Sequence, residues 1–244
     1  MGRGEGLVVV LPTFNEAAQL PPLLQALRLG FPAARLVVVD DRSPDGTGRI
    51  AAELAAEDPL MHVIHRDGPR GLRAAVVAGL RWGADQATTR RLVQMDADGS
   101  HPVAALTALI AATEGPLGAD LALGCRYMPG GGVEGWAAHR RALSWAGNRY
   151  ARAWLGSPLR DLTGGLKCWR VEALAAVGLE RLGAQGYAFQ IEASHRAERA
   201  GLRIVEVPFV FVERRGGRSK MSARIAAEAA WRVPALRWSA RGWS

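Results

Sequence analysis

Short apolar runs alternate with segments of helical spacing over the first 125 residues of the chain. The runs that predict strands are 6–12, 35–41, 60–65, 91–96 and 119–125, and the segments that predict helices are 17–27, 46–57, 71–84 and 103–113. Continuous apolar strands separated by helices are typical of a parallel sheet that is covered on both faces. The pattern therefore predicts an α/β fold around a mostly parallel central sheet.

A glycine-rich stretch, YMPGGGVEGW (127–136), follows this alternating region and predicts an irregular, mobile loop. Residues 140–155 then have the spacing of an amphipathic helix. Its apolar face and its opposite, basic face consist of Leu143, Gly147, Tyr150 and Trp154, and of Arg141, Arg149 and Arg152. Trp145 falls among the arginines, which is unusual for a solvated helix and typical of one at a membrane interface.

The remaining segments are expected to complete one domain. Residues 161–170 and 186–202 have the composition of core elements, and 203–222 predicts a strand that leads into a basic loop. No internal repeat and no interdomain linker is visible in the sequence. We therefore expect a single domain over residues 1–222, into which the loop and helix of 127–156 are inserted, and a basic helix or tail over 223–244.

Composition limits the class of protein. At 244 residues and 49% hydrophobic content, the chain can build one sizeable core. The start of the chain does not resemble a signal peptide, and the longest uncharged apolar stretch is well short of the roughly 20 residues of a spanning helix. Cys125 and Cys168 lack the spacing of a zinc site or disulfide framework. A reduced, cytosolic protein is expected.

The net charge of +8 is concentrated in two segments that are also rich in tryptophan. Residues 136–160 hold five arginines and no acid, and residues 214–244 hold eight basic side chains and one acid. The tryptophans are Trp136, Trp145 and Trp154 in the first segment, and Trp231, Trp238 and Trp243 in the second. Basic clusters interleaved with indoles favour an anionic membrane surface. Nucleic acid and an ordinary solvated surface are the alternatives.

Polar residues follow the predicted strands at the points where the strands end. They are Thr13–Glu16, Asp40–Asp45, Asp96–Asp98 and Arg126. Ligands of open α/β sheets bind outside the carboxyl ends of the strands, so we expect these residues to line one site.

Asp96 and Asp98 are the acids in this set that best indicate a metal. An extended backbone would aim both side chains the same way, about 6–7 Å apart. Two carboxylates that close repel each other unless a cation lies nearby, and Mg²⁺ or Mn²⁺ takes such oxygen ligands together with substrate phosphates. The alternative is structural, because Asp98 and Ser100 also suit a cap or Asx-turn before the next helix.

The other strand ends have weaker signals. Asp45 and Thr47 suit a helix cap, whereas the adjacent acids Asp40 and Asp41 fit hydrogen bonds to a nucleoside ring or ribose. Pro12, Asn15 and Glu16 are by themselves ordinary strand-end and helix-start residues. The chain has neither GxGxxG after its first strand nor GxxxxGK[ST], so NAD binding and P-loop ATP hydrolysis are poorly supported.

Six motifs occur in the order VVVLPTFNE, VVVDDRSPDGT, RDGPRGLRAAVVAGL, MDADGSHP, GCRYMPGGGVEGW and ERRGGRSK. Together they resemble the polyprenol-phosphate (dolichol-phosphate) mannose synthases, which are inverting glycosyltransferases of family 2 with a GT-A, Rossmann-like fold. The resemblance covers roughly residues 6–222, and the GGGVEGW…RR block favours the polyprenol-phosphate branch of the family.

The resemblance implies a donor site and a metal site. The donor residues that it implies are Pro12, Phe14, Glu16, Val39, Asp41, Asp96, Ala97, Asp98, Arg126, Arg214 and Lys220. Phe14 stands where Tyr is frequent, and Gly99 replaces a more usual Leu or Met. Asp96 and Asp98, with help from Ser100, would hold Mg²⁺ or Mn²⁺ against the GDP diphosphate.

The resemblance also implies an acceptor site in the inserted segment. Arg126, Arg140 and Ser144 match contacts to the acceptor phosphate, so that Asp98, Arg126 and Arg140 are the expected catalytic residues. A phosphate acceptor is already largely anionic at neutral pH and needs no strong general base. The histidines, His101 among them, are therefore expected to be incidental, and Glu192 is expected to be structural.

The function implied is transfer of mannose from GDP-mannose to a polyprenyl or dolichyl monophosphate with inversion, which gives a β-mannosyl phosphopolyprenol. The enzyme would work peripherally at the cytoplasmic face of a membrane, by itself or with an anchoring partner protein, and without nucleic acid. Two alternatives are left open. One is a polyprenyl-phosphate glycosyltransferase with another donor such as UDP-glucose, and the other is a non-catalytic nucleotide-sugar- or nucleic-acid-binding module.

Overall fold

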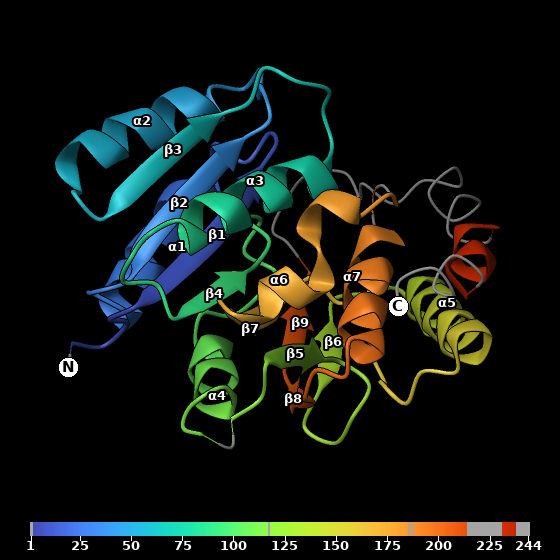
Figure 1. The fold of residues 1–244 in the computed structure, drawn as a ribbon. Coiled ribbons are helices and arrows are strands. Elements are labelled where there is room, and N and C mark those ends of the chain that lie inside the picture. The colour runs from blue at the N-terminus through green and yellow to red at the C-terminus, as the bar shows by residue number, and fades with distance from the viewer. Residues whose placement is uncertain (1, 117, 185, 187, 214–230, 238–244) are drawn as a thin grey trace.

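The computed structural model describes residues 2–116, 118–184, 186, 188–213 and 231–237. These residues form a seven-stranded sheet, a two-stranded sheet and helices on both faces of the larger sheet (Figure 1). The strands are β1 (Leu7–Thr13), β2 (Arg35–Asp40), β3 (Met61–His65), β4 (Arg91–Gln94), β5 (Leu121–Cys125), β6 (Gly132–Glu134), β7 (Lys167–Arg170), β8 (Ile204–Pro208) and β9 (Val210–Val212). The helices are α1 (Leu20–Gly30), α2 (Thr47–Glu57), α3 (Leu72–Ala84), α4 (Ala105–Ala112), α5 (Ala138–Leu155), α6 (Ala173–Val177) and α7 (Ala188–Arg199), with a short 3₁₀ helix, η1 (Leu179–Arg181).

The larger sheet has the strand order β3-β2-β1-β4-β7-β5-β8. Its pairs β1–β2, β1–β4, β2–β3 and β5–β8 are parallel, whereas β7 runs antiparallel between β4 and β5. The strands other than β7 therefore end at the same edge of the sheet, where Thr13 of β1 is paired with Asp40 of β2. This confirms the mostly parallel sheet predicted from the sequence.

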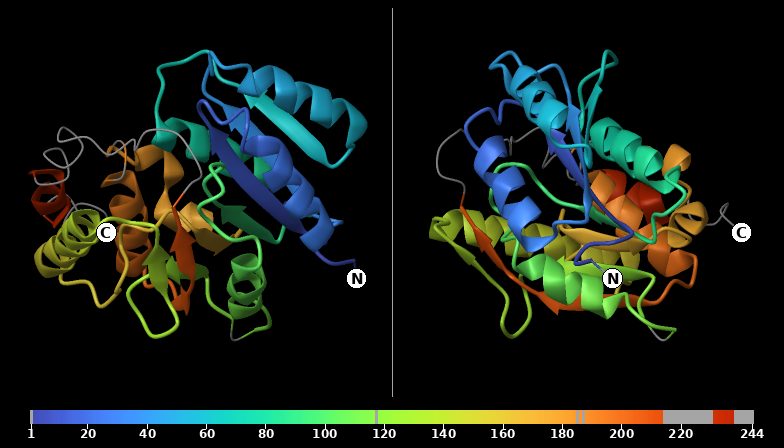
Figure 2. Two further views of the ribbon diagram at one scale, coloured as in Figure 1. Left: turned by 180° about the vertical axis from the view of Figure 1, so that it is seen from behind. Right: turned by 90° about the vertical axis from the view of Figure 1, so that its left-hand side faces the viewer.

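The two faces of the sheet are covered by different helices, as Figure 2 shows. Val9 and Leu11 of β1 belong to a cluster that includes Leu24 of α1 and Leu109 of α4. Their neighbours in β1 point to the opposite face, where they join a second cluster built from α3, α6 and α7. Because successive strand residues alternate between faces, a continuous apolar run such as GLVVVLP is needed to fill both clusters.

Helix α3 packs unusually close to the sheet through two glycines. A Cβ atom at Gly79 would lie 2.4 Å from Cγ1 of Val10, and one at Gly83 would lie 2.4 Å from Cδ2 of Leu92. Glycine at these positions removes the side chains that would otherwise hold the helix away from β1 and β4.

Helix α5 contacts the rest of the domain through Asn148 and through Ala151, which belongs to a small apolar cluster. Its buried residues are Asn148 and Ala151. Asn148 donates a hydrogen bond to the carbonyl of Arg160 and accepts one of 2.9 Å from the backbone N–H of Leu162. The apolar face predicted from the sequence points away from the core, because Leu143 is 56% exposed and Trp154 is 37% exposed.

Two local predictions were wrong. The glycine-rich segment is not wholly irregular, because β6 within it pairs in parallel with β9 and forms the smaller sheet. The fourth strand ends at Gln94 rather than at residue 96, and residues 97–98 form a turn. In both cases the pairing of backbone groups between strands decided where the strands lie. This pairing cannot be read from residue composition.

The carboxyl-terminal segment is described only in part. Residues 231–237 are helical, and this helix lies beside α5 in Figures 1 and 2, with Nη1 of Arg237 2.8 Å from the carbonyl oxygen of Trp154. The predicted basic loop, including Arg214 and Lys220, and most of the predicted tail lie outside the described residues. The division at residue 222 stays a prediction. In the part of the chain that the structure describes, none of the helices has the length and apolarity needed to span a membrane.

Candidate active site

The loops that follow β1 and β2 are joined at the carboxyl edge of the sheet. Backbone N–H groups of Asn15, Glu16 and Ala17 donate to Oγ of Ser43, Oγ1 of Thr47 and Oδ2 of Asp45, at 3.0, 2.9 and 3.1 Å. Burial opposes ionisation of Asp45, but the hydrogen bonds from Thr47 and Ala17 outweigh it and lower the pKa of the carboxyl group. Asp45 is thus a structural anion, which confirms its interpretation as a turn residue, whereas the cap position of α2 is occupied by Gly46.

Backbone strain is concentrated in these two loops. Asn15 has a φ of 60° and Arg42 a φ of 57°, the positive values in which residues other than glycine are uncommon. Between the loops, the guanidinium of Arg70 stacks over the ring of Phe14 at 4.8 Å. Such strain persists only where surrounding contacts enforce it, and it clusters at ligand sites.

The acids that end β2 are both held by internal partners. Oδ1 of Asp40 accepts from Oγ of Ser43 at 2.5 Å, and Oδ2 of Asp41 accepts from the backbone N–H of Gly71 at 2.6 Å. Arg66 forms an ion pair with Asp41. Of the donor residues predicted beside them, Pro12 is half-buried, whereas the side chain of Val39 is fully buried in the core. A contact from Val39 to a nucleotide would therefore have to come from its backbone.

Asp96 and Asp98 lie half-buried in the turn after β4, so the extended arrangement predicted for them is wrong. Oδ1 of Asp98 accepts from the backbone N–H and from Oγ of Ser100, at 3.1 and 2.6 Å. The Asx-turn considered for Asp98 is thus present. It leaves both carboxylates at the edge of the sheet, and Ala97 between them is buried.

His101 fixes the backbone of this turn, so the expectation that it is incidental was wrong. Its Nδ1 accepts from the backbone N–H of Asp96 at 3.0 Å, and its Nε2 lies 4.0 Å from Oδ2 of Asp96. Burial lowers the pKa of His101, against the opposing charges of Asp96 and Asp98. The ring is therefore neutral at pH 7 and acts as a positioning group.

Arg126 is held by a buried carboxylate that the sequence analysis missed. Its Nε and Nη2 contact the two oxygens of Asp161 at 2.7 and 2.8 Å, and Nη2 also donates to Oγ1 of Thr163 at 2.7 Å. Burial opposes the charge on Asp161, but Arg126 outweighs it and lowers the pKa of that carboxyl group. A bidentate pair of this kind fixes the plane of the guanidinium.

The predicted acceptor residues are brought together by aromatic side chains. The ring of Trp136 lies 4.2 Å from the guanidinium of Arg140 and 5.8 Å from that of Arg126. The hydroxyl of Tyr127 lies 2.7 Å from Oγ of Ser144. Arg140 also forms an ion pair with Glu213, at 2.6 Å, at the end of β9.

Strand β9 connects this acceptor group to the acidic turn. Phe211 packs edge-on against His101 and against Trp136, with centroids 5.6 and 5.2 Å apart. The next residue, Val212, donates its backbone N–H to the carbonyl of Ser100 at 3.1 Å. The turn with Asp96 and Asp98 and the arginines of the inserted segment therefore belong to one packed unit.

A buried polar network, which the sequence analysis also missed, underlies the site. Nζ of Lys167 donates to Oε1 of Gln190 and to the carbonyl of Gly164, each at 2.6 Å, and Gln94 donates to the same Oε1 at 2.9 Å. Burial lowers the pKa of Lys167 to about 7. The sequence pattern that could have predicted this network is a polar residue inside an apolar run, such as Lys167 in LKCW.

Glu192 has the structural role that the sequence suggested. Its carboxylate accepts from the backbone N–H groups of Gly183 and Ala184 at 3.0 and 2.7 Å, and it pairs with Arg196 at 3.1 Å. These contacts anchor α7 to the segment that precedes it.

Comparison with known proteins places this site in a family. Residues 8–178 match the profile described as Glycosyl transferase family 2. The chain belongs to glycosyl transferase family 2. It is therefore a glycosyltransferase, and the enzyme class predicted from the sequence is confirmed.

Two relatives match this family member over nearly their whole length. An undecaprenyl-phosphate mannosyltransferase of Micrococcus luteus is 45% identical over 232 residues, which cover 95% of this chain and 93% of that protein. A polyprenol monophosphomannose synthase of Mycolicibacterium smegmatis is 43% identical over 236 residues, with 96% and 87% covered. The resemblance inferred from the six motifs is thus confirmed.

Solved structures confirm the GT-A fold. The glucosyl-3-phosphoglycerate synthase of Mycobacterium tuberculosis, in a complex with Mn²⁺ and UDP, superposes with a TM-score of 0.68 at 21% identity and covers 98% of this chain and 81% of its own. A mannosyltransferase of Pyrobaculum calidifontis in complex with GDP-Man and Mn²⁺ gives a TM-score of 0.60 at 20% identity, with 98% and 74% covered.

Proposed function

We propose that this glycosyltransferase moves mannose from GDP-mannose to a polyprenyl monophosphate, with inversion, and releases GDP and a β-mannosyl phosphopolyprenol. The observation that carries the proposal is the nearly full-length match, at 45% and 43% identity, to two proteins named for mannose transfer to polyprenyl carriers. The site geometry supports it, because an acidic turn and two arginines meet around β9. A diphosphate leaving group and a phosphate nucleophile need such a site.

The acids of the turn fit a divalent cation that is completed by substrate. In the described part of the chain, no group of three or more His, Cys, Asp or Glu residues is arranged to hold a metal. A site with only Asp96 and Asp98 suits Mg²⁺ or Mn²⁺, which share their coordination with phosphate oxygens. When bound, the metal supplies countercharge for the departing diphosphate. The mannosyltransferase of Pyrobaculum calidifontis, whose structure contains both GDP-Man and Mn²⁺, supports this interpretation.

Arg126 would face the phosphates with an orientation that Asp161 fixes. A preorganised guanidinium stabilises charge that develops on a leaving phosphate without the cost of reorienting during the reaction. The acceptor phosphate is itself the nucleophile, and with a second pKa of about 6 it is mostly dianionic at neutral pH. Neutral His101 and the fully engaged Glu192 are therefore not needed as bases.

Arg140 would bind the acceptor phosphate by giving up its ion pair with Glu213. Its side chain is 31% exposed and that of its partner Glu213 is 40% exposed, so the ion pair is a weak, solvent-screened one. A phosphate with more charge and bidentate geometry competes well for such an arginine. Ser144 and Tyr127, whose hydroxyl oxygens lie 2.7 Å apart, would complete the acceptor contacts.

Helix α5 would bring the enzyme to the cytoplasmic face of a membrane. Leu143 and Trp145 are 56% and 55% exposed, which is unusual for large apolar side chains of a monomer surface. On one flank of the helix Tyr150 and Trp154 continue the apolar surface of Leu143, whereas Trp145 lies among the arginines of the opposite flank. A helix with this division lies in the interface plane, where indoles sit at headgroup level.

The test is turnover in detergent with GDP-mannose, Mg²⁺ or Mn²⁺ and a short polyprenyl phosphate, measured as GDP release. We expect Asp98→Ala to reduce kcat by at least about 10²-fold, whereas the exposed control Glu53→Ala on α2 leaves it unchanged. Arg140→Ala should raise KM for the lipid phosphate and spare GDP-mannose binding. A preference for UDP-glucose would show that the donor is UDP-glucose rather than GDP-mannose. Absence of turnover with any nucleotide sugar and metal would indicate a non-catalytic binding module instead.

A further inference from the structure

A small basic pocket lies beside α5 and shares one residue, Tyr127, with the proposed acceptor contacts. It has a volume of about 80 Å³ and is lined by Tyr127, Trp145, Asn148, Arg149, Arg152 and Arg160. A single water needs about 10–15 Å³ measured in this way, so the pocket holds a group several times larger. Arg126, Arg140 and Ser144 are not among its lining residues.

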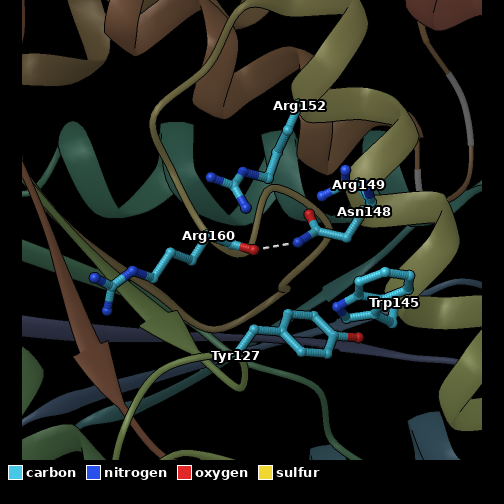
Figure 3. A pocket seen from close by; sticks show the side chains of 6 residues that line it. All are labelled: Tyr127, Trp145, Asn148, Arg149, Arg152 and Arg160. Carbon is cyan, nitrogen blue, oxygen red and sulfur yellow. Dashed lines mark hydrogen bonds between the residues drawn. The ribbon is translucent and has the colours of Figure 1, made fainter.

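The positive charge of the pocket comes from α5. Figure 3 shows the side chain of Arg152 extending from the helix toward the segment that carries Arg160, while the guanidinium of Arg160 points away. The guanidinium of Arg149 lies 5.7 Å from the ring of Trp145. The hydrogen bond from Asn148 to the carbonyl of Arg160 closes the inner wall (Figure 3).

These charges have no acidic partner among the described residues. None of the ion pairs in that part of the chain includes Arg149, Arg152 or Arg160. Within the same described residues, Nε of Arg152 is buried and makes no hydrogen bond. A buried, unpaired guanidinium nitrogen is costly, and an oxyanion would satisfy both its charge and its donor capacity.

We propose that this pocket binds the phosphate of an anionic phospholipid headgroup, separately from the acceptor phosphate. The inference rests on the membrane location in the proposed function. A bilayer is favoured over a free anion because α5 has the division of an interfacial helix: Leu143, Tyr150 and Trp154 are exposed on its apolar flank, and the arginines of the opposite flank would meet the headgroups. The site also accounts for Trp145 among the arginines, since its ring forms a wall of the pocket.

The experiment measures binding of the full chain to phosphatidylcholine vesicles with and without phosphatidylglycerol. Removing one basic charge near an anionic bilayer weakens binding about five-fold by charge alone. Arg141→Gln is the matched control, because Arg141 is exposed on the same basic flank and outside the pocket. We expect Arg152→Gln to lose more than ten-fold in phosphatidylglycerol vesicles, and Arg152→Lys to fall between Arg152→Gln and wild type because lysine keeps the charge but not the fork geometry.

Equal losses of vesicle binding in Arg152→Gln and Arg141→Gln, with unchanged thermal unfolding, would overturn the proposal. They would show that the arginines act only by non-specific electrostatic attraction to the bilayer. Titration with inorganic phosphate in the absence of vesicles tests whether the pocket binds a free anion rather than a lipid headgroup. Phosphate binding that Arg152→Gln abolishes, together with unchanged vesicle binding, would assign the pocket to a free anion and reject the headgroup. GDP release by the wild type in detergent tests the proposed function independently, so the two failures are distinguishable.

Discussion

The acids of this protein differ in what their carboxylates contact. Asp40, Asp161 and Glu192 are buried and hydrogen-bonded by neighbouring backbone or side chains, so their role is to hold loops and guanidinium groups in place. Asp96 and Asp98 are half-buried at the carboxyl edge of the sheet. Burial, rather than residue type, separates these structural acids from the candidate ligands.

The pair of Arg126 and Asp161 gives the clearest prediction for a single residue. Asp161→Asn leaves a buried guanidinium without its counterion, and we expect a loss of about 3–5 kcal/mol in the free energy of unfolding. Thr163→Val is the control, because it removes one hydrogen bond to the same guanidinium and should cost only about 1 kcal/mol. Urea denaturation of the two variants measures both values, and similar losses would contradict the importance of the ion pair.

Lys167 gives a prediction for pH. Burial lowers its pKa from an ordinary value of 10.5 to about 7 in the folded protein. Between these two values the unfolded chain binds more protons than the folded one, so stability rises with pH there, and below pH 7 the effect is absent because both states are protonated.

Lys167→Met removes this titration. The stability of the wild type relative to Lys167→Met should therefore increase by about 2 kcal/mol from pH 7 to pH 9. Denaturation of both proteins over this range provides the measurement. A difference that stays constant with pH would show that Lys167 remains charged in the folded state.

At the scale of secondary-structure elements, two helices meet the domain in different ways. Helix α3 lies against the sheet through Gly79 and Gly83, whereas α5 contacts its neighbours through Asn148 and Ala151 and leaves its apolar flank outside. The first arrangement serves the core, and the second leaves surface for a ligand or a bilayer.

Two glycine substitutions test this contrast. Gly83→Ala places a Cβ atom 2.4 Å from Leu92 and 3.0 Å from Val8, and such overpacking should cost about 1–3 kcal/mol. Gly147→Ala on α5 meets no atom within 4 Å and should stabilise the helix by about 0.5–1 kcal/mol. Thermal unfolding should therefore shift in opposite directions, and a stabilised Gly83→Ala would show that α3 does not need the close approach.

At the scale of the whole molecule, the proposed donor loops, the inserted segment and β9 share one edge of the sheet. Phe211 of β9 contacts both His101 and Trp136, although it follows them by 110 and 75 positions in the chain. Distant segments are thus combined so that the residues proposed for donor, acceptor and membrane contacts lie close together.

The membrane location makes a prediction at this scale. Leu143→Gln on the exposed flank of α5 should weaken vesicle association about ten-fold, because burying a leucine side chain contributes about 1.5–3 kcal/mol. Leu29→Gln is the control, since Leu29 is 79% exposed on α1, outside this surface. Vesicle sedimentation compares the two, and equal behaviour would count against α5 as the contact.

The sequence by itself determined the alternating elements, the mostly parallel sheet and the family, because periodicity and local motifs are written in consecutive residues. It also indicated Asp96, Asp98, Arg126 and Arg140 as candidate site residues. Only the tertiary structure decided that Asp161 orients Arg126, that Lys167 and Gln190 lie beneath the site, and that β6 pairs with β9. These contacts join residues far apart in the chain, and neither burial nor a long-range partner can be read from a local pattern.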